Sequence, residues 1–159
     1  MSTGVTLAPF EAADAEALRA VKVAPWQVIF SGQPADFVDT PEDGCTIHVI
    51  RKRGAVVGMF RLDRLFHLHH TFAQSDTPGL RSFIVDHDRQ GEGIGKAVTA
   101  QMRGYAKAQL PRASALYLTV NLRNPGAYKA YTKGGFVDTG AEYLLGTAGP
   151  QHILRMPLI

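Results

Sequence analysis

This chain has little of what holds a protein in a membrane or an oxidising compartment. Cys45 is the one cysteine among 159 residues, which excludes an internal disulfide framework. The longest apolar stretches are far too short to span a bilayer. The first residues, M-S-T-G-V-T, lack the cationic and apolar parts of a signal sequence. These absences predict a soluble cytoplasmic protein.

Long runs of one charge are also absent. The formal net charge is +3, and the basic residues are spread along the chain. This distribution favours a small anionic ligand over nucleic acid as a partner, and no membrane partner is expected. A length of 159 residues suits one hydrophobic core. We therefore expect a single domain over residues 1–159.

The chain does have a glycine-rich junction between a strand and a helix. Residues 83–95 read F-I-V-D-H-D-R-Q-G-E-G-I-G, an apolar strand that runs into Gly91, Gly93 and Gly95. Apolar residues at helical spacing follow, so a helix begins here. Glycines let backbone N–H groups approach a ligand, and the helix dipole favours negative charge at this end. The junction therefore predicts a phosphate site.

Two common phosphate motifs do not fit this junction. A Walker loop requires glycine five residues before the Gly-Lys pair and Ser or Thr after it, but Gln90 precedes Gly95-Lys96 and Ala97 follows. A dinucleotide fingerprint that starts at Gly91 requires glycine at Lys96 and a later acid for the ribose, and the chain has neither. A nucleotide-binding interaction domain is therefore disfavoured.

A second pattern lies further along the chain. Residues 124–136 read N-P-G-A-Y-K-A-Y-T-K-G-G-F. Asn124 suits a helix N-cap and Pro125 suits the first helical position. We expect a helix over residues 125–133 that ends at Gly134-Gly135.

Together the two segments resemble the GNAT superfamily, the acyl-coenzyme-A-dependent N-acetyltransferases. The pyrophosphate segment of that family reads Q/R-x-x-G-x-G/A, which Gln90 and the glycines after it match. Its later motif, N-x-x-A-x-x-L/A-Y-x-K-x-G-F, is matched from Asn124 through Tyr131 to Phe136. The resemblance implies an α/β (α+β) fold with a central twisted, mixed, mostly antiparallel sheet flanked by helices. It also implies acetyl-coenzyme A (acetyl-CoA) as co-substrate.

The resemblance implies roles for individual residues as well. Tyr131 protonates the departing thiolate, because a phenol with a pKa of about 10 can donate to a thiolate whose conjugate acid has a pKa of about 8.5. Otherwise Tyr131 only packs on the sheet. Asn124 belongs to the catalytic site, or serves only as a helix cap. Backbone groups of the strand at 80–85 bind the pantetheine arm and stabilise the oxyanion. The implied coenzyme-binding residues are Phe83, Ile84, Val85, Gln90, Gly91, Glu92, Gly93, Ile94, Gly95, Lys96, Asn124 and Tyr131.

The sequence does not identify the general base. Some GNAT members use a glutamate near the start of the strand at 80–85, but this chain has Gly79 and Leu80 there. A strand over residues 66–72 would put His67 and His69 on one face. The candidates are Asp63, His67, His69 and Asp86.

Metal binding and cysteine chemistry are the alternatives for nearby residues. His67 and His69 form an H-x-H pattern, but no nearby cysteine or carboxylate pair completes a site, so no metal is expected. Cys45 follows a turn and has no patterned partner, which is typical of a packing cysteine.

The expected acceptor is a primary amine of a small molecule. Trp26 and Phe30 follow the first helix, a region that often forms the acceptor wall in GNAT enzymes. Together with Asp63 and His67 they are the candidate substrate residues. A non-catalytic acyl-CoA-binding module and a protein N-terminal acetyltransferase remain open, and exposed closing strands allow a homodimer.

The hydrophobic pattern predicts the remaining elements. Pro25 is expected to end the first helix, and residues 46–62 are expected to form a hairpin. Expected strands cover 5–8, 46–50, 56–62, 66–72, 80–85, 116–120, 136–145 and 153–158, and expected helices cover 11–21, 34–38, 93–109 and 125–133.

Overall fold

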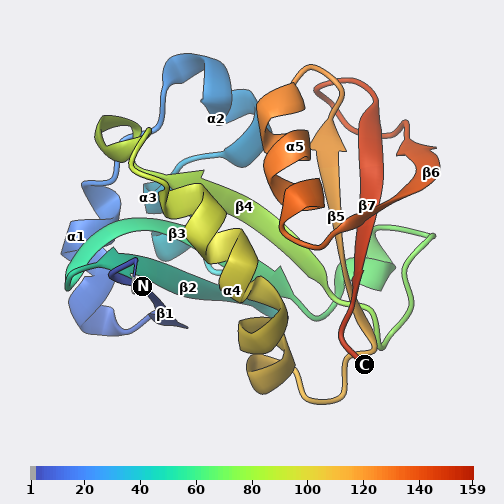
Figure 1. Ribbon diagram of the computed structural model, residues 1–159, viewed down its shortest axis with the longest axis horizontal. Helices are drawn as coiled ribbons and strands as arrows, with labels where there is room; N and C mark the ends of the chain where they lie inside the picture. The colour runs from blue at the N-terminus through green and yellow to red at the C-terminus, as the bar shows by residue number, and fades with distance from the viewer. Residues whose placement is uncertain (1–2) are drawn as a thin grey trace. The chain divides into compact units, whose positions relative to one another are not determined.

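The computed structural model describes residues 3–159, and Figure 1 labels its elements. The strands are β1 (Val5–Pro9), β2 (Cys45–Lys52), β3 (Ala55–Asp63), β4 (Gly79–Val85), β5 (Ala115–Asn121), β6 (Val137–Tyr143) and β7 (Gln151–Pro157). The α-helices are α1 (Ala15–Arg19), α2 (Pro25–Ser31), α3 (Pro34–Asp39), α4 (Ile94–Gln109) and α5 (Pro125–Lys133). Short 3-10 helices are η1 (Ala12–Asp14), η2 (Phe66–Leu68) and η3 (His87–Arg89). Within the described chain, no helix has the length and apolar character that crossing a bilayer requires.

The strands form a mixed sheet. Hydrogen-bonded neighbours follow the order β1-β2-β3-β4-β5-β7-β6. The pairs β1–β2, β2–β3, β5–β7 and β6–β7 are antiparallel, whereas β4 and β5 run parallel. A parallel pair requires a crossover, and α4 lies in that connection. The expected α/β class, with a mixed and mostly antiparallel sheet, is confirmed.

The chain folds into two compact units. The first unit holds the chain up to Asp63 together with Leu80–Val98, and the second holds Arg64–Gly79 together with Thr99–Ile159. Two elements, β4 and α4, contribute residues to both units.

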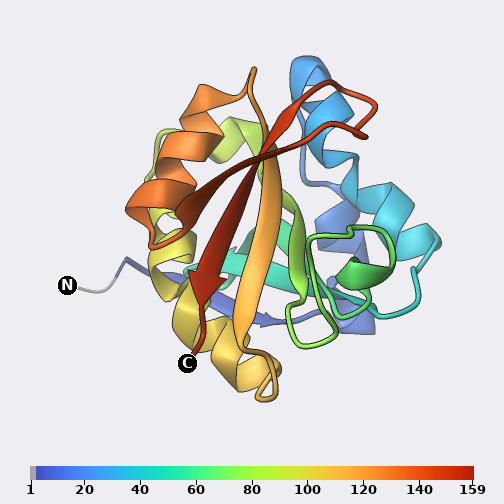
Figure 2. The ribbon, with the colours of Figure 1, turned by 90° about the vertical axis from the view of Figure 1, so that its right-hand side faces the viewer.

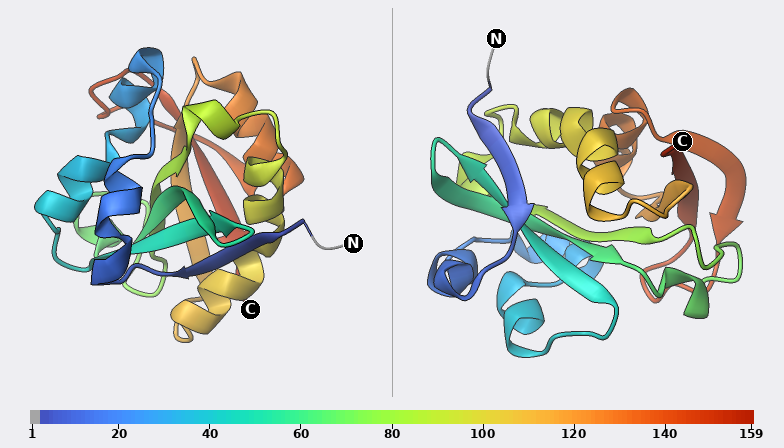
Figure 3. Two further views of the ribbon diagram at one scale, coloured as in Figure 1. Left: turned by 90° about the vertical axis from the view of Figure 1, so that its left-hand side faces the viewer. Right: turned by 90° about the horizontal axis from the view of Figure 1, so that it is seen from below.

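The core of the first unit is formed by β2, β3, β4 and the segment around α1. Its buried members are Leu18, Val21, Val49, Met59 and Ile84. Phe37 and Val38 of α3 pack against the same cluster, and Figure 3 shows α1 and α3 on the same side of β2 and β3. Because each large apolar side chain contributes about 1.5–3 kcal/mol when it leaves water, this cluster fixes α1 and α3 on the sheet.

The second unit is built on β5, β7 and β6, with α5 alongside β5 (Figure 2). The part of α4 in this unit buries Met102 and Ala106, which are four residues apart. That spacing is one turn of helix, as the expected amphipathic pattern requires. The predicted helix over 125–133 matches α5 in type and bounds.

The predicted hairpin is confirmed, since β2 and β3 pair antiparallel across a turn at Arg53-Gly54. Both turn residues have positive φ, 50° and 87°, which gives the turn the right-handed twist that suits a tight hairpin.

Two predictions about the connecting segments are wrong. Residues 66–72 form η2 and turns rather than a strand, because the apolar residues there pack as a local aromatic cluster in which His70 stacks on Phe66 at 3.8 Å. Pro25 does not end the first helix, since α1 ends earlier at Arg19 and Pro25 opens α2. Proline at the first helical position needs no hydrogen-bonded N–H, so the same residue type starts a helix as readily as it ends one.

A buried histidine lies in β2 of the first unit. His48 is 2% exposed, and its ring stacks on Phe60 at 5.2 Å between centroids. Its Nε2 lies 2.8 Å from the Thr46 hydroxyl. Burial lowers the pKa of His48 to about 4, so the native protein holds this side chain neutral.

We therefore expect His48 to make folding stability pH-dependent. Its native pKa of about 4 lies below the ordinary value of about 6.5. The unfolded chain thus binds a proton that the native chain does not, and stability falls as the pH is lowered from 6.5 to 4, by up to about 3 kcal/mol. Urea unfolding at several pH values should show a shallower pH dependence for His48→Phe than for the wild type. His69→Gln, in an exposed loop, is the control, and equal slopes for all three proteins would contradict the assignment.

Candidate active site

The phosphate loop predicted from the sequence lies in the first unit, between β4 and α4. Gly91 and Gly93 have φ of 86° and 78°, a left-handed conformation that residues with a side chain rarely adopt. A Cβ on Gly91, Gly93 or Gly95 would meet no atom within 4 Å, so these glycines face open space. The 16-residue α4 begins at Ile94, and its first amides have no intrahelical partner. The geometry fits a phosphate group.

Charged side chains surround this loop. The Glu92 carboxylate accepts hydrogen bonds from Arg89 Nε at 2.8 Å and Lys52 Nζ at 2.9 Å. The hydrogen bond from Arg89, followed by the one from Lys52, lowers the pKa of Glu92 to about 2. Two cations therefore face one anion, which leaves a local positive charge. The sequence did not point to Lys52, because it comes from β2, far away along the chain.

The coenzyme-binding residues predicted on β4 also lie in the first unit. Ile84 is fully buried in the core, while Phe83 and Val85 are half-buried. The side-chain amide of Gln90 donates a long hydrogen bond to the Val85 carbonyl at 3.5 Å. This contact connects the end of β4 to the phosphate loop.

The second predicted motif lies in the second unit, on α5. Asn124 is the N-cap, and its Oδ1 accepts from the Ala127 amide at 3.4 Å. Tyr131 lies two turns further along the helix and contacts Phe136 edge-to-face at 5.7 Å between centroids. Burial raises the pKa of Tyr131 above the ordinary value of tyrosine, so its hydroxyl holds its proton at neutral pH.

The structure separates the candidate bases. Asp63 is buried and paired with Arg81 at 3.0 Å, and Asp86 caps η3 by accepting from the Asp88 amide at 3.0 Å. His67 lies on η2, with a buried Nδ1 that has no hydrogen-bond partner among residues 3–159. His69 follows η2 and is exposed. The strand face that was expected to hold both histidines does not exist.

The candidate substrate aromatics lie on α2 in the first unit. Trp26 is 61% exposed, and Phe30 is half-buried one turn later. They share a helix face, because four residues make about one turn. The sequence placed these residues after a helix and did not predict α2 itself.

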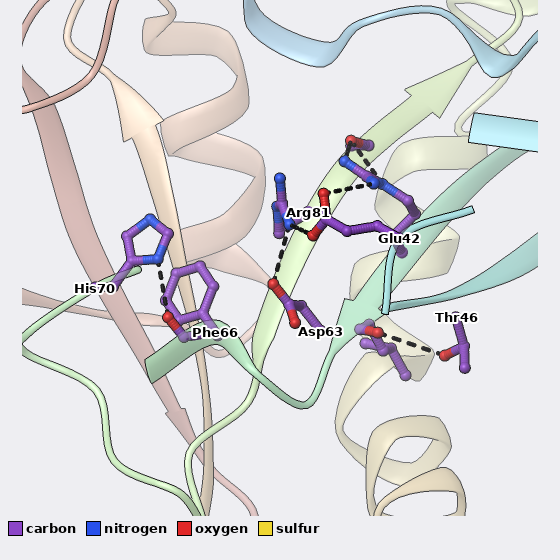
Figure 4. Close-up of polar contacts among 9 residues, drawn as sticks. Glu42, Thr46, Asp63, Phe66, His70 and Arg81 are labelled. Atoms are coloured by element: carbon purple, nitrogen blue, oxygen red, sulfur yellow. Dashed lines mark hydrogen bonds and ion pairs between the residues drawn. The ribbon is translucent and has the colours of Figure 1, made fainter. Parts of the chain in front are cut away.

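A group of possible metal ligands occurs in the first unit. One ligand atom each from Glu42, Cys45 and Asp63 lie within 4.8 Å of one another. Arg81 Nη1 contacts both carboxylates, at 2.5 Å from Glu42 and 3.0 Å from Asp63, as Figure 4 shows. Arg61 Nη1 lies 3.9 Å from Glu42, so two arginines balance the two carboxylates and this group is an ion-pair network. Cys45 is half-buried and burial raises the pKa of its thiol, which disfavours the thiolate.

We expect Asn124→Ala to lower the free energy of unfolding by about 0.5–1 kcal/mol, because the α5 N-cap loses its side-chain acceptor. Asn124→Ser keeps a hydroxyl acceptor and should recover most of that loss in urea unfolding. An Asn124→Ala variant as stable as the wild type would show that the long 3.4 Å hydrogen bond contributes nothing.

Comparison with known proteins identifies the family. The model of the acetyltransferase (GNAT) family matches residues 14–136, most of the chain. A search of curated proteins gives no significant match.

Solved structures share the fold at low sequence identity. A chimera of the Vibrio cholerae spermidine N-acetyltransferase SpeG and hSSAT is 16% identical, with a TM-score of 0.69 over 98% of this chain and 96% of that one. The aminoglycoside acetyltransferase AAC(6′)-Ib in complex with paromomycin and acetyl-CoA is 14% identical, with a TM-score of 0.78 over 97% and 93%. Its complex with coenzyme A and kanamycin is 14% identical, with a TM-score of 0.74 over 96% and 94%. With the matched family model, the left-handed glycine turn before α4 and the Asn124 cap of α5, these similarities lead to one conclusion: the chain belongs to the GNAT family of acetyltransferases.

Proposed function

We propose that this enzyme transfers the acetyl group of acetyl-CoA directly to a primary amine of a small molecule, and that residues 1–159 act as one N-acetyltransferase domain. The observation that carries the proposal is the phosphate loop, in which the glycines at 91 and 93 take left-handed conformations directly before the 16-residue α4. Family membership supports it. So do two structures of similar fold that were solved with acetyl-CoA or coenzyme A bound.

In this proposal the coenzyme pyrophosphate binds at residues 90–96. Backbone N–H groups of the loop and the first turn of α4 donate to the phosphate oxygens. Lys52 and Arg89 add positive charge, since they outnumber the Glu92 carboxylate between them. Lys96 lies in the first turn of the same helix.

The backbone of β4 holds the pantetheine arm as an added strand would be held. Phe83 and Val85 supply the main-chain groups for this contact, and the Gln90 side chain gives up its long hydrogen bond to Val85 when the arm binds. An N–H group of Ile84 or Val85 stabilises the oxyanion of the tetrahedral intermediate.

Tyr131 is the general acid. The amine nitrogen bonds to the thioester carbonyl carbon, the C–S bond breaks, and the thiolate takes the phenolic proton. One proton leaves the ammonium group to solvent before the attack, and the second proton, lost from the nitrogen after it has bonded to the carbonyl carbon, restores the phenol, so atoms and charge balance. Burial raises the pKa of Tyr131, and the same low-dielectric surroundings raise the pKa of the leaving thiol, so burial acts on both partners of the proton transfer in the same direction. Asn124 contacts the coenzyme in addition to capping α5.

The acceptor is a small amine that carries positive charge. The proteins of similar fold are named for spermidine or were solved with aminoglycosides, which are cationic amines. Trp26 and Phe30 offer an aromatic face for such a cation, with His67 as a further residue of the amine site. Asp63, the other candidate, is 1% exposed and paired with Arg81, so the amine does not contact it directly.

One observation favours a non-catalytic acyl-CoA-binding module as the second candidate. Asp63 and Asp86, two of the four candidate bases, already accept hydrogen bonds within the protein. Such a module would bind the coenzyme without turnover.

A thermal-shift series tests the coenzyme first. Acetyl-CoA and coenzyme A at about 100 times their dissociation constants should raise stability by about 2.7 kcal/mol, whereas ATP and NAD should have little effect. Thiol release from acetyl-CoA is then measured with spermidine, kanamycin and a short peptide with a free N-terminus. A shift without thiol release would favour the non-catalytic module, and transfer to the peptide alone would favour a protein N-terminal acetyltransferase. No coenzyme shift would overturn the proposal.

Tyr131→Phe should lower kcat by about 10²–10⁴-fold, because the phenolic proton is lost while the ring remains. The dissociation constant of acetyl-CoA should stay unchanged in isothermal titration calorimetry. Tyr128→Phe is the matched control on the same helix. Its hydroxyl donates to Asp138 at 2.9 Å and has no part in the proposed chemistry. If both variants turn over at the wild-type rate, Tyr131 is not the acid.

A further inference from the structure

Ser82 has an unusual backbone conformation in the middle of β4. Its φ is 53°, in the left-handed region that residues other than glycine rarely adopt. In residues 3–159 the other non-glycine with positive φ is Arg53, which lies in a hairpin turn. Ser82 lies inside a strand instead, so its left-handed conformation needs stabilising contacts from the surrounding structure.

The side chains of β4 lose their alternation at this point. Arg61 and Asp63 are two residues apart on β3 and therefore lie on one face of the sheet. Arg81 contacts Asp63, and Ser82 contacts Arg61, so two consecutive residues of β4 reach the same face. We call this irregularity at Arg81 and Ser82 the bulge, because, like a β-bulge, a break in the alternation redirects the strand that follows.

Arg61 binds Ser82 directly. Its Nε and Nη2 donate to the Ser82 Oγ at 3.1 Å and 2.8 Å. The guanidinium group lies 3.8 Å from the centroid of the Phe37 ring, and the residue is only 6% exposed. A planar group fixed by stacking and by two hydrogen bonds has little freedom to move.

Arg81, the residue before Ser82 in β4, is also fixed by its contacts. Arg81 Nη1 contacts Glu42 at 2.5 Å and Asp63 at 3.0 Å, and Figure 4 shows it between the two carboxylates. Just beyond the bulge, β3 approaches β4 so closely that a Cβ on Gly58 would clash with the Ile84 carbonyl oxygen. The backbone of Phe83, Ile84 and Val85 therefore leaves the bulge along a fixed path.

We infer that Arg61 is a positioning residue: it holds the left-handed conformation of Ser82 and thereby sets the backbone of Phe83–Val85 for the pantetheine arm of the coenzyme. The inference rests on the proposed function, in which this backbone binds the arm. It assigns Arg61 no contact with the coenzyme or with the reacting atoms.

Unfolding experiments without any ligand test whether Arg61 stabilises the conformation of Ser82. Arg61→Met, Ser82→Ala and the double variant form a cycle, and their free energies of unfolding should be non-additive because the two side chains bond each other. Additive effects would overturn the inference. Arg51→Met is the matched control, since Arg51 of β2 is a partly buried arginine paired with Asp14 at 2.6 Å.

The consequence for the coenzyme is tested with two probes. Acetyl-CoA contains the pantetheine arm, whereas 3′-phospho-ADP carries only the phosphate end. We expect Arg61→Met to weaken acetyl-CoA binding about tenfold, the loss expected when two backbone hydrogen bonds are weakened, and to leave 3′-phospho-ADP binding unchanged. Arg51→Met should change neither. Equal losses for both probes, or no loss, would overturn the inference.

Glycine at position 82 separates positioning from general stabilisation. Glycine adopts φ near 53° without steric cost, so Ser82→Gly added to Arg61→Met should recover part of the lost acetyl-CoA affinity, and Ser82→Ala should recover none. Equal affinities in the two double variants would overturn the inference. A wild-type protein that binds neither probe would overturn the proposed function itself. It would also overturn the role of Arg61 in coenzyme binding, which depends on that function. If the wild type binds both probes and the variants bind like it, only the inference fails.

Discussion

The backbone conformation between Ser82 and Gly93 is the constraint on which the proposed chemistry depends. In the proposed site the coenzyme is held mainly by main-chain groups, whose direction is set by φ and ψ rather than by the choice of side chain. Ser82, Gly91 and Gly93 all take left-handed conformations. Two of these positions are glycine, where the conformation has no steric cost. The third is serine, and a buried arginine bonds its side chain.

The same constraint explains why the first unit buries charge. Arg61 and Asp63 are 6% and 1% exposed, and removing such groups from water costs free energy that one ion pair rarely recovers. Here the cost is spread over a network, since Arg81 contacts two carboxylates and Arg61 adds Ser82 and the Phe37 ring. An apolar core would be easier to stabilise at this place, but it would not supply a donor for the Ser82 hydroxyl. The network therefore fixes the orientation of the Ser82 side chain, which apolar packing alone would not do.

Much of the fold was predictable because its signals are local. The hairpin of β2 and β3, the start of α4 and the bounds of α5 follow from turn residues, caps and spacing within a few positions. The prediction of a strand at residues 66–72 was wrong because apolar residues there pack on one another around Phe66 and His70. Helix α2 was missed because Pro25 was taken as an end rather than a beginning. In both cases the residue types permit two structures, and packing decides between them, as in the contact of Phe72 with Tyr117.

The sequence by itself determined the family pattern, the phosphate loop and the helix that carries Tyr131, because each depends on residues close together in the chain. Only the tertiary structure decided which side chains meet across strands. It brought Lys52 of β2 to Glu92 and Arg61 of β3 to Ser82 of β4, and it paired Asp63 with Arg81. The physical reason is that strand register and packing, rather than sequence neighbourhood, set these contacts. The partner of a buried charge can be identified only once the register of the neighbouring strands is known.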